Sequence, residues 1–330
     1  MRVLVTGGAG YIGSHVVRAL ARRGHEVVIY DDLSTGHREL AHGFRLIEGG
    51  VGDADTLRPA LAGIDAVMHF AAKSLVSESM RNPRKYFENN VRDGIVLLNT
   101  CVDAGVKRFI FYSTAAVYGV PEKSPITEDA RKQPVNPYGF SKLSFEYALQ
   151  SYDAAYGLRF MSLRYFNAAG ADDSGEIGEL HDPETHLIPN ALKAAAGDGQ
   201  LEIFGTDYDT PDGTCIRDYI HVTDLADAHV LALEDLAHGG DSAILNLGTG
   251  KGSTVKEVVR TVEEVAGREL PKRIAPRRAG DPPILLADPS RAEQRLGWKA
   301  RLSLRDMVAS SWNFFQKAAA TRHSSVVSGH

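Results

Sequence analysis

Residues 1–32 read MRVLVTGGAGYIGSHVVRALARRGHEVVIYDD, and this stretch decides the fold. An apolar run of strand length over residues 2–6 meets a glycine-rich turn, GGAGYIG, which leads directly into a helical pattern over residues 14–23. A second apolar run follows over residues 26–30. This order predicts a strand, a tight turn, a helix and a second strand, which is the opening unit of a doubly wound α/β fold.

The glycines of the turn and the end of the second strand predict a ligand. Gly7, Gly10 and Gly13 allow a tight turn and a close approach of backbone, so that a pyrophosphate can rest on the N–H groups at the helix N-terminus. The second strand ends in Asp31 and Asp32. A carboxylate at that place accepts both ribose hydroxyls of an adenosine and repels a 2′-phosphate. The pattern therefore predicts an NAD site rather than an NADP site.

Further apolar runs of strand length alternate with helical patterns along the chain. The runs cover residues 44–48, 66–70, 108–113, 159–165 and 244–247, and the helical patterns cover residues 84–104 and 141–156. Because runs such as VVI, AVMHF and FIFY are continuously apolar, the strands are expected to be covered on both faces, which is typical of a parallel sheet. The predicted fold class is α/β, with a doubly wound, Rossmann-like parallel sheet.

A loop-rich pattern after Tyr165 predicts a second, smaller lobe of mixed α/β structure. Glycines, prolines and acidic residues gather over residues 167–185 and 205–213, whereas residues 219–247 return to strand and helix character. We expect an NAD-binding domain and a substrate lobe, followed by a flexible tail. The expected bounds are residues 1–166 plus about 219–247 for the first, about 167–218 plus 248–317 for the second, and 318–330 for the tail.

Composition excludes several classes of function. The chain has 330 residues, and 37 Lys+Arg against 42 Asp+Glu give a net charge of -5. It lacks the bulk positive charge that nucleic acid or an acidic membrane surface would attract, so we expect neither partner. Cys101 and Cys215 have no CxxC spacing, no His, Cys and Asp cluster has metal-ligand spacing, and no apolar run approaches the length of a membrane span. We predict no metal and a cytoplasmic protein.

Tyr138 and Lys142 carry the chemistry that the sequence predicts. They lie at i and i+4 in NPYGFSKLSFEY, which places them on one face of a helix. A neighbouring ammonium favours the phenolate of a tyrosine, so the pair could supply a base. Thr114 ends the run FIFYST, at the edge of the sheet where ligands bind, and its hydroxyl could relay a substrate proton. The YxxxK spacing alone also fits an ordinary surface pair, but with NAD and Thr114 it predicts a site that oxidises an alcohol.

Longer motifs resemble one enzyme family. They are the GxxGxxG turn, STAAVYG, PYGFSK, LRYFNAAGA, DYDTPDGTCIRDYIHV and APRRAGD. In these motifs the chain resembles the extended short-chain dehydrogenase/reductase family, and within it the UDP-glucose 4-epimerases, also called UDP-galactose 4-epimerases. The similarity runs from Met1 to about residue 315, and DGTCIRDYIHV is its most specific part.

The resemblance implies roles for individual residues. The implied catalytic residues are Tyr138, Lys142 and Thr114. The implied NAD site comprises Gly7, Gly10, Tyr11, Ile12, Gly13, Asp31, Asp32, Leu33, Ser34, Thr35, Gly36, Gly50, Val51, Phe70, Ala71, Ala72, Lys73, Asn89, Thr114, Tyr138, Lys142 and Phe166. The implied UDP-sugar site comprises Thr114, Tyr138, Asn167, His186, Leu187, Phe204, Arg217, Arg278, Asp281 and Leu285.

The activity that the resemblance implies is the interconversion of UDP-galactose and UDP-glucose. It would pass through a transient 4-keto sugar and NADH, with Tyr138 as base, a tightly bound NAD and a homodimeric enzyme. A 4-epimerase of UDP-N-acetylhexosamines or of another UDP-sugar, a net NAD-dependent nucleotide-sugar dehydrogenase and a non-catalytic NAD-binding protein stay open as alternatives. A 4,6-dehydratase is disfavoured because Ala115 and Ala116 carry no carboxylate for the elimination.

Three positions depart from the pattern of relatives. Gly50 stands where many relatives have an aspartate near the adenine, a contact that Asp53 would have to replace. His186 stands where others have an asparagine. Leu285 is intermediate in size between the bulky tyrosine associated with excluding N-acetylated sugars and the small residue associated with accepting them, and we favour the unacetylated pair.

Overall fold

The large sheet organises the molecule. The computed structural model describes residues 1–278 and 281–327. Its seven-stranded sheet has the order β10-β6-β5-β4-β1-β2-β3, and every neighbouring pair runs parallel. The strands are β1 (Arg2–Thr6), β2 (Glu26–Asp31), β3 (Arg45–Glu48), β4 (Ala66–His69), β5 (Arg108–Thr114), β6 (Arg159–Tyr165) and β10 (Ala243–Leu247). The predicted doubly wound parallel sheet is confirmed.

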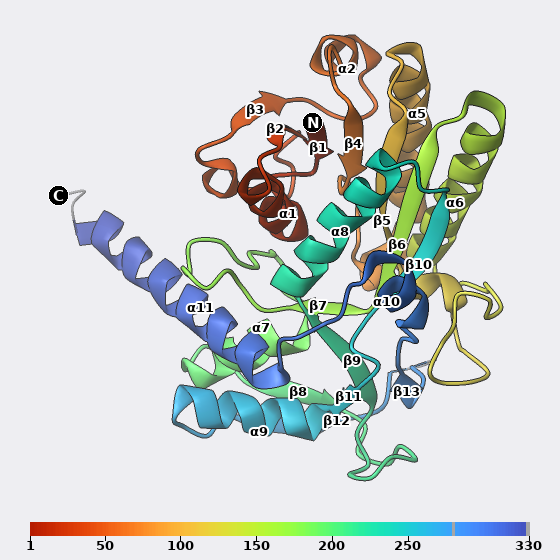
Figure 1. The fold of residues 1–330 in the computed structure, drawn as a ribbon. Coiled ribbons are helices and arrows are strands. Elements are labelled where there is room, and N and C mark those ends of the chain that lie inside the picture. Colours follow the sequence, from red (N-terminus) through yellow and green to blue (C-terminus); the bar gives the residue numbers. More distant parts are fainter. Residues whose placement is uncertain (279–280, 328–330) are drawn as a thin grey trace.

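Helices cover both faces of this sheet (Figure 1). One face carries α1 (Tyr11–Arg22) and α8 (Val222–Ala237), and the other carries α2 (Ala54–Ala60), α5 (Gly94–Asp103) and α6 (Pro137–Tyr156). Successive residues of one strand feed opposite cores, since Val3 and Val5 pack with Leu20 while Leu4 packs with Leu97. This alternation explains why the strands are apolar without interruption.

The predicted helix over residues 84–104 is interrupted in the structure. It consists of α4 (Pro83–Phe87), a π-helical segment (Glu88–Asp93) and α5, and it follows the short α3 (Val76–Arg81). The side chain of Asn90, in the widened segment, is buried and binds the backbone of Lys73. Widened turns of this kind often mark functional positions in helices.

A smaller lobe lies beyond the carboxyl ends of the large sheet. One sheet joins β7 (Asn167–Ala169), β9 (Ile216–His221), β11 (Gly252–Thr254) and β13 (Ile284–Leu285), and a second pairs β8 (Leu201–Phe204) with β12 (Lys272–Ala275). Its helices are α7 (Leu187–Ala195), α9 (Val255–Ala266) and α11 (Leu304–Val327). Val258 and Val262 of α9 share a core with Leu192 of α7 and Met307 of α11. Two short 3₁₀ turns cover Arg38–Ala41 and Ala115–Tyr118.

A late segment of the chain packs on the first lobe, which the sequence did not predict. Helix α10 (Ser290–Leu296) places Ala292 in the core beside α1 and α8, and Trp298 joins the same core. The indole N–H of Trp298 donates to the carbonyl oxygen of Asp224 at 2.9 Å. Residues 290–300 therefore pack on the first lobe, although they lie within the segment 248–317 that was expected to form the second.

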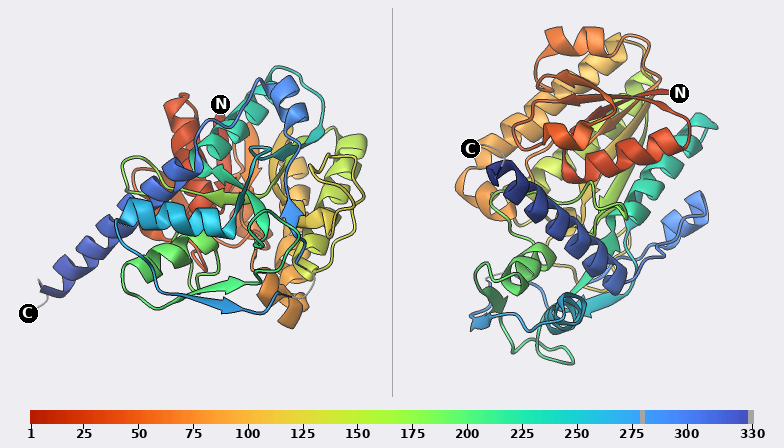
Figure 2. Two further views of the ribbon diagram at one scale, coloured as in Figure 1. Left: turned by 90° about the horizontal axis from the view of Figure 1, so that it is seen from below. Right: turned by 90° about the vertical axis from the view of Figure 1, so that its left-hand side faces the viewer.

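The C-terminal segment is helical rather than irregular over most of its length. Helix α11 continues through Val327, whereas the sequence predicts a flexible tail from residue 318 onward; residues 328–330 lie outside the described residues. No glycine or proline interrupts residues 304–327, so the helix has no local signal to end. Figure 2 shows this part of α11 projecting beyond both lobes. Within the described residues, every helix is too short or too polar to cross a bilayer.

Candidate active site

The glycine-rich turn closes tightly at the start of α1. Gly7 has a φ of +72°, and a Cβ on it would lie 2.5 Å from the backbone nitrogen of Ala71. A Cβ on Gly13 would lie 2.2 Å from the carbonyl oxygen of Gly7. The N-cap of α1 is Gly10, which offers no side chain to the first N–H groups of the helix. Backbone donors at a helix N-terminus, with no side chain in front of them, suit a phosphate group.

Asp31, at the end of β2, supports this turn directly. Its carboxylate accepts hydrogen bonds from the backbone N–H of Ala9 and of Leu33, each at 2.9 Å. Burial raises the pKa of Asp31 above its usual value, although these two N–H groups act in the opposite sense. Asp32 is exposed and accepts from the N–H of Ser34. Asp31 thus joins the glycine-rich turn to the loop that follows β2, and the sequence did not predict this structural role.

The loops after β2 and β4 meet across the end of the sheet. The ammonium of Lys73 donates to the hydroxyl of Ser34 at 2.7 Å. Asn90 holds the backbone of Lys73 through both its amide oxygen, at 2.9 Å, and its amide nitrogen, at 3.0 Å, and it also donates to Ser141. The predicted Asn89 donates to Asn90 instead. Asn90 was missed, because nothing in the dipeptide NN shows which side chain turns inward.

The remaining cofactor positions lie along the same edge of the sheet. The Tyr11 hydroxyl donates to the carbonyl oxygen of Gly170 at 2.6 Å, and Val51 and Phe70 are buried. The Tyr30 hydroxyl donates to the carbonyl oxygen of Gly50 at 3.1 Å. Asp53, suggested as a substitute for the missing adenine contact, instead caps α2 by accepting from the N–H groups of its first turn. Of the other predicted positions, Ile12 lies in the first turn of α1, and Leu33, Thr35, Gly36, Ala71 and Ala72 lie in the loops after β2 and β4.

Tyr138 and Lys142 sit on the buried face of α6. Asn136 caps this helix by accepting from the N–H of Gly139 at 2.8 Å. A Cβ on Gly139 would lie 2.6 Å from the carbonyl oxygen of Ala116, so glycine lets the start of α6 pack against the turn that follows Thr114. Only 4% of Tyr138 and 1% of Lys142 is exposed to solvent. The predicted face is confirmed, and it points into the protein.

A second tyrosine, Tyr112, joins these residues and was not predicted. Its hydroxyl lies 2.7 Å from that of Tyr138. The ammonium of Lys142 donates to the backbone carbonyl of Tyr112 at 2.9 Å and lies 3.8 Å from the centre of the Tyr112 ring. Thr114 accepts from the N–H of Ala116, and its hydroxyl lowers the pKa of Tyr138. In FIFYST, Tyr112 is indistinguishable from a core aromatic residue.

Burial governs the acid–base properties of this group. Desolvation raises the pKa of Tyr138 well above its usual value and also raises the pKa of Tyr112. The hydrogen bond between the two phenols lowers the pKa of Tyr112 and raises that of Tyr138. Desolvation lowers the pKa of Lys142 well below its usual value. An anionic cofactor or substrate group is therefore the kind of partner that would keep Lys142 charged.

Behind Lys142, a buried ion pair fastens α6 to the sheet. Glu146 accepts from the hydroxyls of Ser113 and Ser162, at 2.6 and 2.9 Å, and from the guanidinium of Arg164, at 2.9 and 2.5 Å. Arg164 also donates to the hydroxyl of Tyr118 at 2.9 Å. These groups have no counterpart among the predicted residues. They fix the helix that carries the candidate base.

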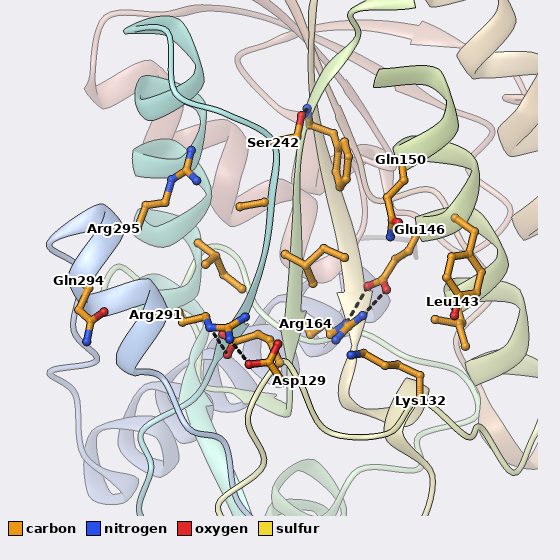
Figure 3. A pocket seen from close by; sticks show the side chains of 16 residues that line it. Asp129, Lys132, Leu143, Glu146, Gln150, Arg164, Ser242, Arg291, Gln294 and Arg295 are labelled. Carbon is orange, nitrogen blue, oxygen red and sulfur yellow. Dashed lines mark hydrogen bonds and ion pairs between the residues drawn. The ribbon is translucent and has the colours of Figure 1, made fainter. Parts of the chain in front are cut away.

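A cleft of about 800 Å³ opens on the far side of this ion pair. Its walls come from α6, β6, β10, α10 and the loop that precedes α6, and they include Lys132, Gln150 and Arg291 (Figure 3). Arg291 pairs with Glu128 and Asp129, and Arg164 pairs with Glu146, so charged side chains in the wall already neutralise one another. The predicted site residues do not line this cleft.

The candidate sugar-nucleotide residues gather on the smaller lobe. The guanidinium of Arg217 pairs with Asp281, and that of Arg278 lies 4.0 Å from the centre of the Phe204 ring. Leu285 pairs with Arg217 in the register of β13 and β9. The amide of Asn167 donates to the carbonyl oxygen of Asp218 at 3.0 Å, and Phe166 packs in the cluster that also contains Leu285. These residues are far apart in the sequence, and the short strands bring them together.

His186 precedes Leu187 at the start of α7 and belongs to a cluster with His181, Glu179 and Glu184. Its Nδ1 lies 2.6 Å from the Glu179 carboxylate and 3.2 Å from that of Glu184. The two carboxylates raise the pKa of His186, so the ring is charged at neutral pH. Among the described residues, these four side chains form one group whose possible ligand atoms lie within 4.8 Å of one another. Since each histidine already contacts a carboxylate, we interpret the cluster as an ion-pair network.

Other residues noted in the sequence have structural partners. His69 is buried, with its ring 2.7 Å from the hydroxyl of Thr6, and burial lowers its pKa to about 3. His221 accepts from the N–H of Thr223 and caps α8. Cys101 and Cys215 are buried free thiols.

The fold and the site define an enzyme class. A parallel sheet with a glycine-rich first turn, an acidic residue ending its second strand and a buried Tyr–Lys pair on the helix beside the end of β5 is the architecture of the extended short-chain dehydrogenase/reductases. The chain belongs to the NAD dependent epimerase/dehydratase family, whose family model matches residues 3–248.

Individual relatives are similar over nearly the whole chain. The UDP-glucose 4-epimerase of Azospirillum brasilense is 52% identical over 314 residues, which cover 94% of this chain and 90% of that protein. The UDP-glucose 4-epimerase of Brucella ovis, solved in complex with NAD, is 48% identical with a TM-score of 0.93 and covers 95% of this chain and 98% of its own. The enzyme of Bifidobacterium longum, solved with NAD+ and UDP, is 39% identical with a TM-score of 0.90, covering 97% and 99%.

Proposed function

We propose that this chain interconverts UDP-galactose and UDP-glucose by inverting C4 of the sugar, with NAD as a tightly held cofactor. The observation that carries the proposal is the buried group of Tyr138, Lys142 and Thr114 at the end of β5. This group lies in a chain that is 52% identical to a UDP-glucose 4-epimerase. The same group of residues suits the removal and return of a proton on a secondary alcohol.

The residues present fit an NAD molecule. The turn at Gly7 and Gly13 leaves room for backbone alone, which suits a pyrophosphate at the start of α1, and Asp31 ends β2 where an adenosine ribose would be bound. Lys73 and Lys142 supply positive charge farther along the edge of the sheet. When bound, the nicotinamide would accept hydride from C4 of the sugar and return it to the opposite face.

The chain's own residues would divide the remaining work. Tyr138 would take the proton of the C4 hydroxyl and later give it back, and Thr114 would orient that hydroxyl. Arg217 and Arg278 offer forked guanidinium groups for the diphosphate. Strong binding of the nucleotide with weak binding of the sugar would let the sugar rotate between the two hydride transfers.

Two other reactions on this scaffold are less well supported. Ala115 and Ala116 form a short turn after Thr114 and carry no acid or base for a 4,6-dehydratase. A net dehydrogenase would exchange its cofactor at every turnover, and a non-catalytic NAD-binding protein would have no need of the buried Tyr138 and Lys142 pair.

The decisive experiment supplies no cofactor. Purified protein is incubated with UDP-galactose, and the sugar nucleotides are separated by chromatography and identified by NMR. We expect UDP-glucose to form up to an equilibrium mixture, without stoichiometric NADH. Stoichiometric NADH would indicate a net dehydrogenase, and no product even with added NAD would refute the proposed substrate.

N-acetylated UDP-sugars are the second candidate substrates, and Leu285 is the observation that favours testing them. The side chain is half-buried and packs near Phe166 and Leu143, in a cluster where a tyrosine would occupy more space. We expect Leu285→Tyr to lower the activity on any N-acetylated substrate by about tenfold or more relative to UDP-galactose, because the larger side chain would fill the space of the acetyl group. Parallel assays of both substrates measure this ratio, and an unchanged ratio would contradict the role of Leu285.

The proposal also covers the oligomeric state, the domain division, the location and the pathway of the enzyme. Exposed apolar side chains on neighbouring α3, α4 and α6, among them Met80, Phe87 and Phe140, support a homodimer formed through these helices. The division into a cofactor domain (1–166 plus about 219–247, joined by residues 290–300) and a sugar-nucleotide lobe is supported by their separate cores. Cytoplasmic location and a place in galactose metabolism follow from the proposed substrate and the free thiols.

A further inference from the structure

Tyr112 occupies a position that no role proposed so far explains. Its side chain lies on the opposite face of β5 from Phe111, and its hydroxyl reaches that of Tyr138 at 2.7 Å. The ring stacks on Tyr165, with ring centres 4.7 Å apart and planes 12° apart, and also faces Phe70 at 6.5 Å and 21°. The stack holds the ring so that the hydroxyl points at the candidate base.

Hydrogen bonding makes the two phenols complementary. A phenolate at Tyr138 would accept from the hydroxyl of Tyr112, 2.7 Å away, and the Thr114 hydroxyl also lowers the pKa of Tyr138. Thr114 is free to donate because its oxygen already accepts from the N–H of Ala116 at 3.1 Å. A phenolate at Tyr112 would have the Tyr138 hydroxyl as its only hydrogen-bond donor among the described side chains. The hydrogen bond between the phenols lowers the pKa of Tyr112, whereas Thr114 lowers the pKa of Tyr138. Because, among the described residues, only Tyr138 has this second hydroxyl beside it, the phenolate is placed on Tyr138, with Tyr112 protonated.

We propose that Tyr112 is a positioning residue for the reaction: its hydroxyl donates a hydrogen bond to the phenolate oxygen of Tyr138, so that the two phenols act as one acid–base unit. The inference rests on the proposed function. When Tyr138 accepts the proton of the sugar hydroxyl, Tyr112 keeps its own proton. The Tyr112 oxygen then accepts a hydrogen bond from the new Tyr138 hydroxyl, or the two oxygens share the transferred proton. No proton is lost from the pair in this exchange.

Most of the titratable groups that surround the two phenols are neutral. Tyr86 of α4 lies edge-on to Tyr138 with ring centres 6.4 Å apart, and burial raises its pKa, so it is neutral. His69 of β4 and His229 of α8 have pKa values lowered by burial to about 3 and about 4. Tyr165 of β6 is also neutral, because burial raises its pKa. On α6, Lys142 faces Tyr112, and Glu146 is neutralised by Arg164 of β6.

The test is a pH profile of turnover for Tyr112→Phe in the NAD-loaded protein. This change removes the hydroxyl and keeps the stacked ring. We expect the alkaline shift of the activity profile to be about one pH unit or more, because the phenolate loses a charge-assisted hydrogen bond. At neutral pH the turnover should fall about tenfold and should recover toward the wild-type value as the pH rises.

Tyr165→Phe is the matched control. Tyr165 belongs to the same stack, but its buried hydroxyl has no hydrogen-bond partner among the described residues. Its removal should leave the profile unchanged. An unshifted profile for Tyr112→Phe, an equal shift for both variants, or a loss of turnover that is the same at every pH would overturn the proposal.

A second measurement does not depend on catalysis. In the ultraviolet difference spectrum of tyrosinate, followed against pH in the NAD-loaded protein, the step of the phenol pair is the one that Tyr138→Phe removes from the wild-type curve. This step should move upward in Tyr112→Phe but not in Tyr165→Phe. If wild-type protein fails to convert UDP-galactose while this pattern holds, the proposed function is wrong and the phenol pair is real. If turnover is found but the step stays in place in Tyr112→Phe, the pair is refuted and the function stands.

Discussion

At the scale of the residue, the chemistry of the site depends on desolvation. Tyr138 and Lys142 are both almost completely buried, and burial opposes the charged form of each. A phenolate becomes accessible here only through specific partners, namely hydroxyl donors and nearby positive charge. The i,i+4 spacing places the two residues on one helix face but does not itself supply this environment.

Tyr138→Phe tests the base directly. Since only the hydroxyl is removed, the ring should remain packed and NAD should remain bound. We expect turnover of UDP-galactose to fall by about 10²- to 10⁴-fold, the range typical of a lost general base. The assay measures initial rates together with the NAD released on denaturation. Tyr156→Phe, at an exposed position on the same helix, is the control, and full activity in Tyr138→Phe would remove this residue from the mechanism.

At the scale of the element, helix α6 is held in position by contacts that could not be predicted from its own sequence. Asn136 caps its start, Gly139 allows close packing on the turn after Thr114, and Glu146 binds Ser113 of β5 and Arg164 of β6. The buried Glu146–Arg164 pair carries a high cost if one partner is lost, because the other charge stays buried without compensation.

Glu146→Gln should therefore destabilise the protein strongly. The change preserves shape but leaves the Arg164 guanidinium in the core without a counter-charge. We expect the free energy of unfolding to drop by about 3–5 kcal/mol, measured by chemical denaturation. On the same helix, the Asp153 carboxylate forms an exposed ion pair with Arg159. Asp153→Asn should cost less than about 1 kcal/mol, and equal losses in both variants would contradict the assigned role of Glu146.

At the scale of the whole molecule, distant segments are tied together where the two lobes meet. Asp218 is buried in β9 and accepts from the N–H groups of Thr249, Gly250 and Ala287. The segment that precedes α7 is held against the first lobe, since Tyr11 donates to the carbonyl of Gly170 and the ring of His37 lies 2.8 Å from the carbonyl of Leu180. The ion-pair network around His186 completes this segment.

The His186 network should make stability depend on pH. The carboxylates of Glu179 and Glu184 raise the pKa of His186 above that of the unfolded chain. The contribution is therefore fully present below the unfolded pKa of about 6.5 and is lost as the pH rises through the folded value. Because 49% of the side chain is exposed, although its polar edge is enclosed by carboxylates, we expect no more than about 1 kcal/mol.

His186→Gln, compared with wild type by denaturation at mildly acidic and at strongly alkaline pH, measures this contribution. The variant should be less stable than wild type at the acidic end, and the difference should vanish at the alkaline end. His42→Gln, at an exposed position, is the control. A difference that grows with pH would show that the sign is wrong.

Much of the fold could be predicted because its signals are local. The strand–turn–helix order over residues 1–32, the acidic end of β2 and the boundaries of β1 and β6 follow from periodicity and from glycine chemistry within a few residues. Three features were not predicted: the interruption of a helix at residues 88–93, the packing of α10 on the first lobe and the length of α11. These depend on side chains that find partners elsewhere, such as Asn90 on the backbone of Lys73.

The sequence by itself thus determined the parallel α/β architecture, the NAD-type turn and the Tyr138–Lys142 pair, because each is encoded in the spacing of neighbouring residues. Only the tertiary structure decided which groups surround that pair: Tyr112 at its hydroxyl, Glu146 and Arg164 behind it, and the ion-pair network at His186. The physical reason is that burial and hydrogen-bond partners are set by residues distant in the chain, and these conditions fix the proton affinity of a side chain.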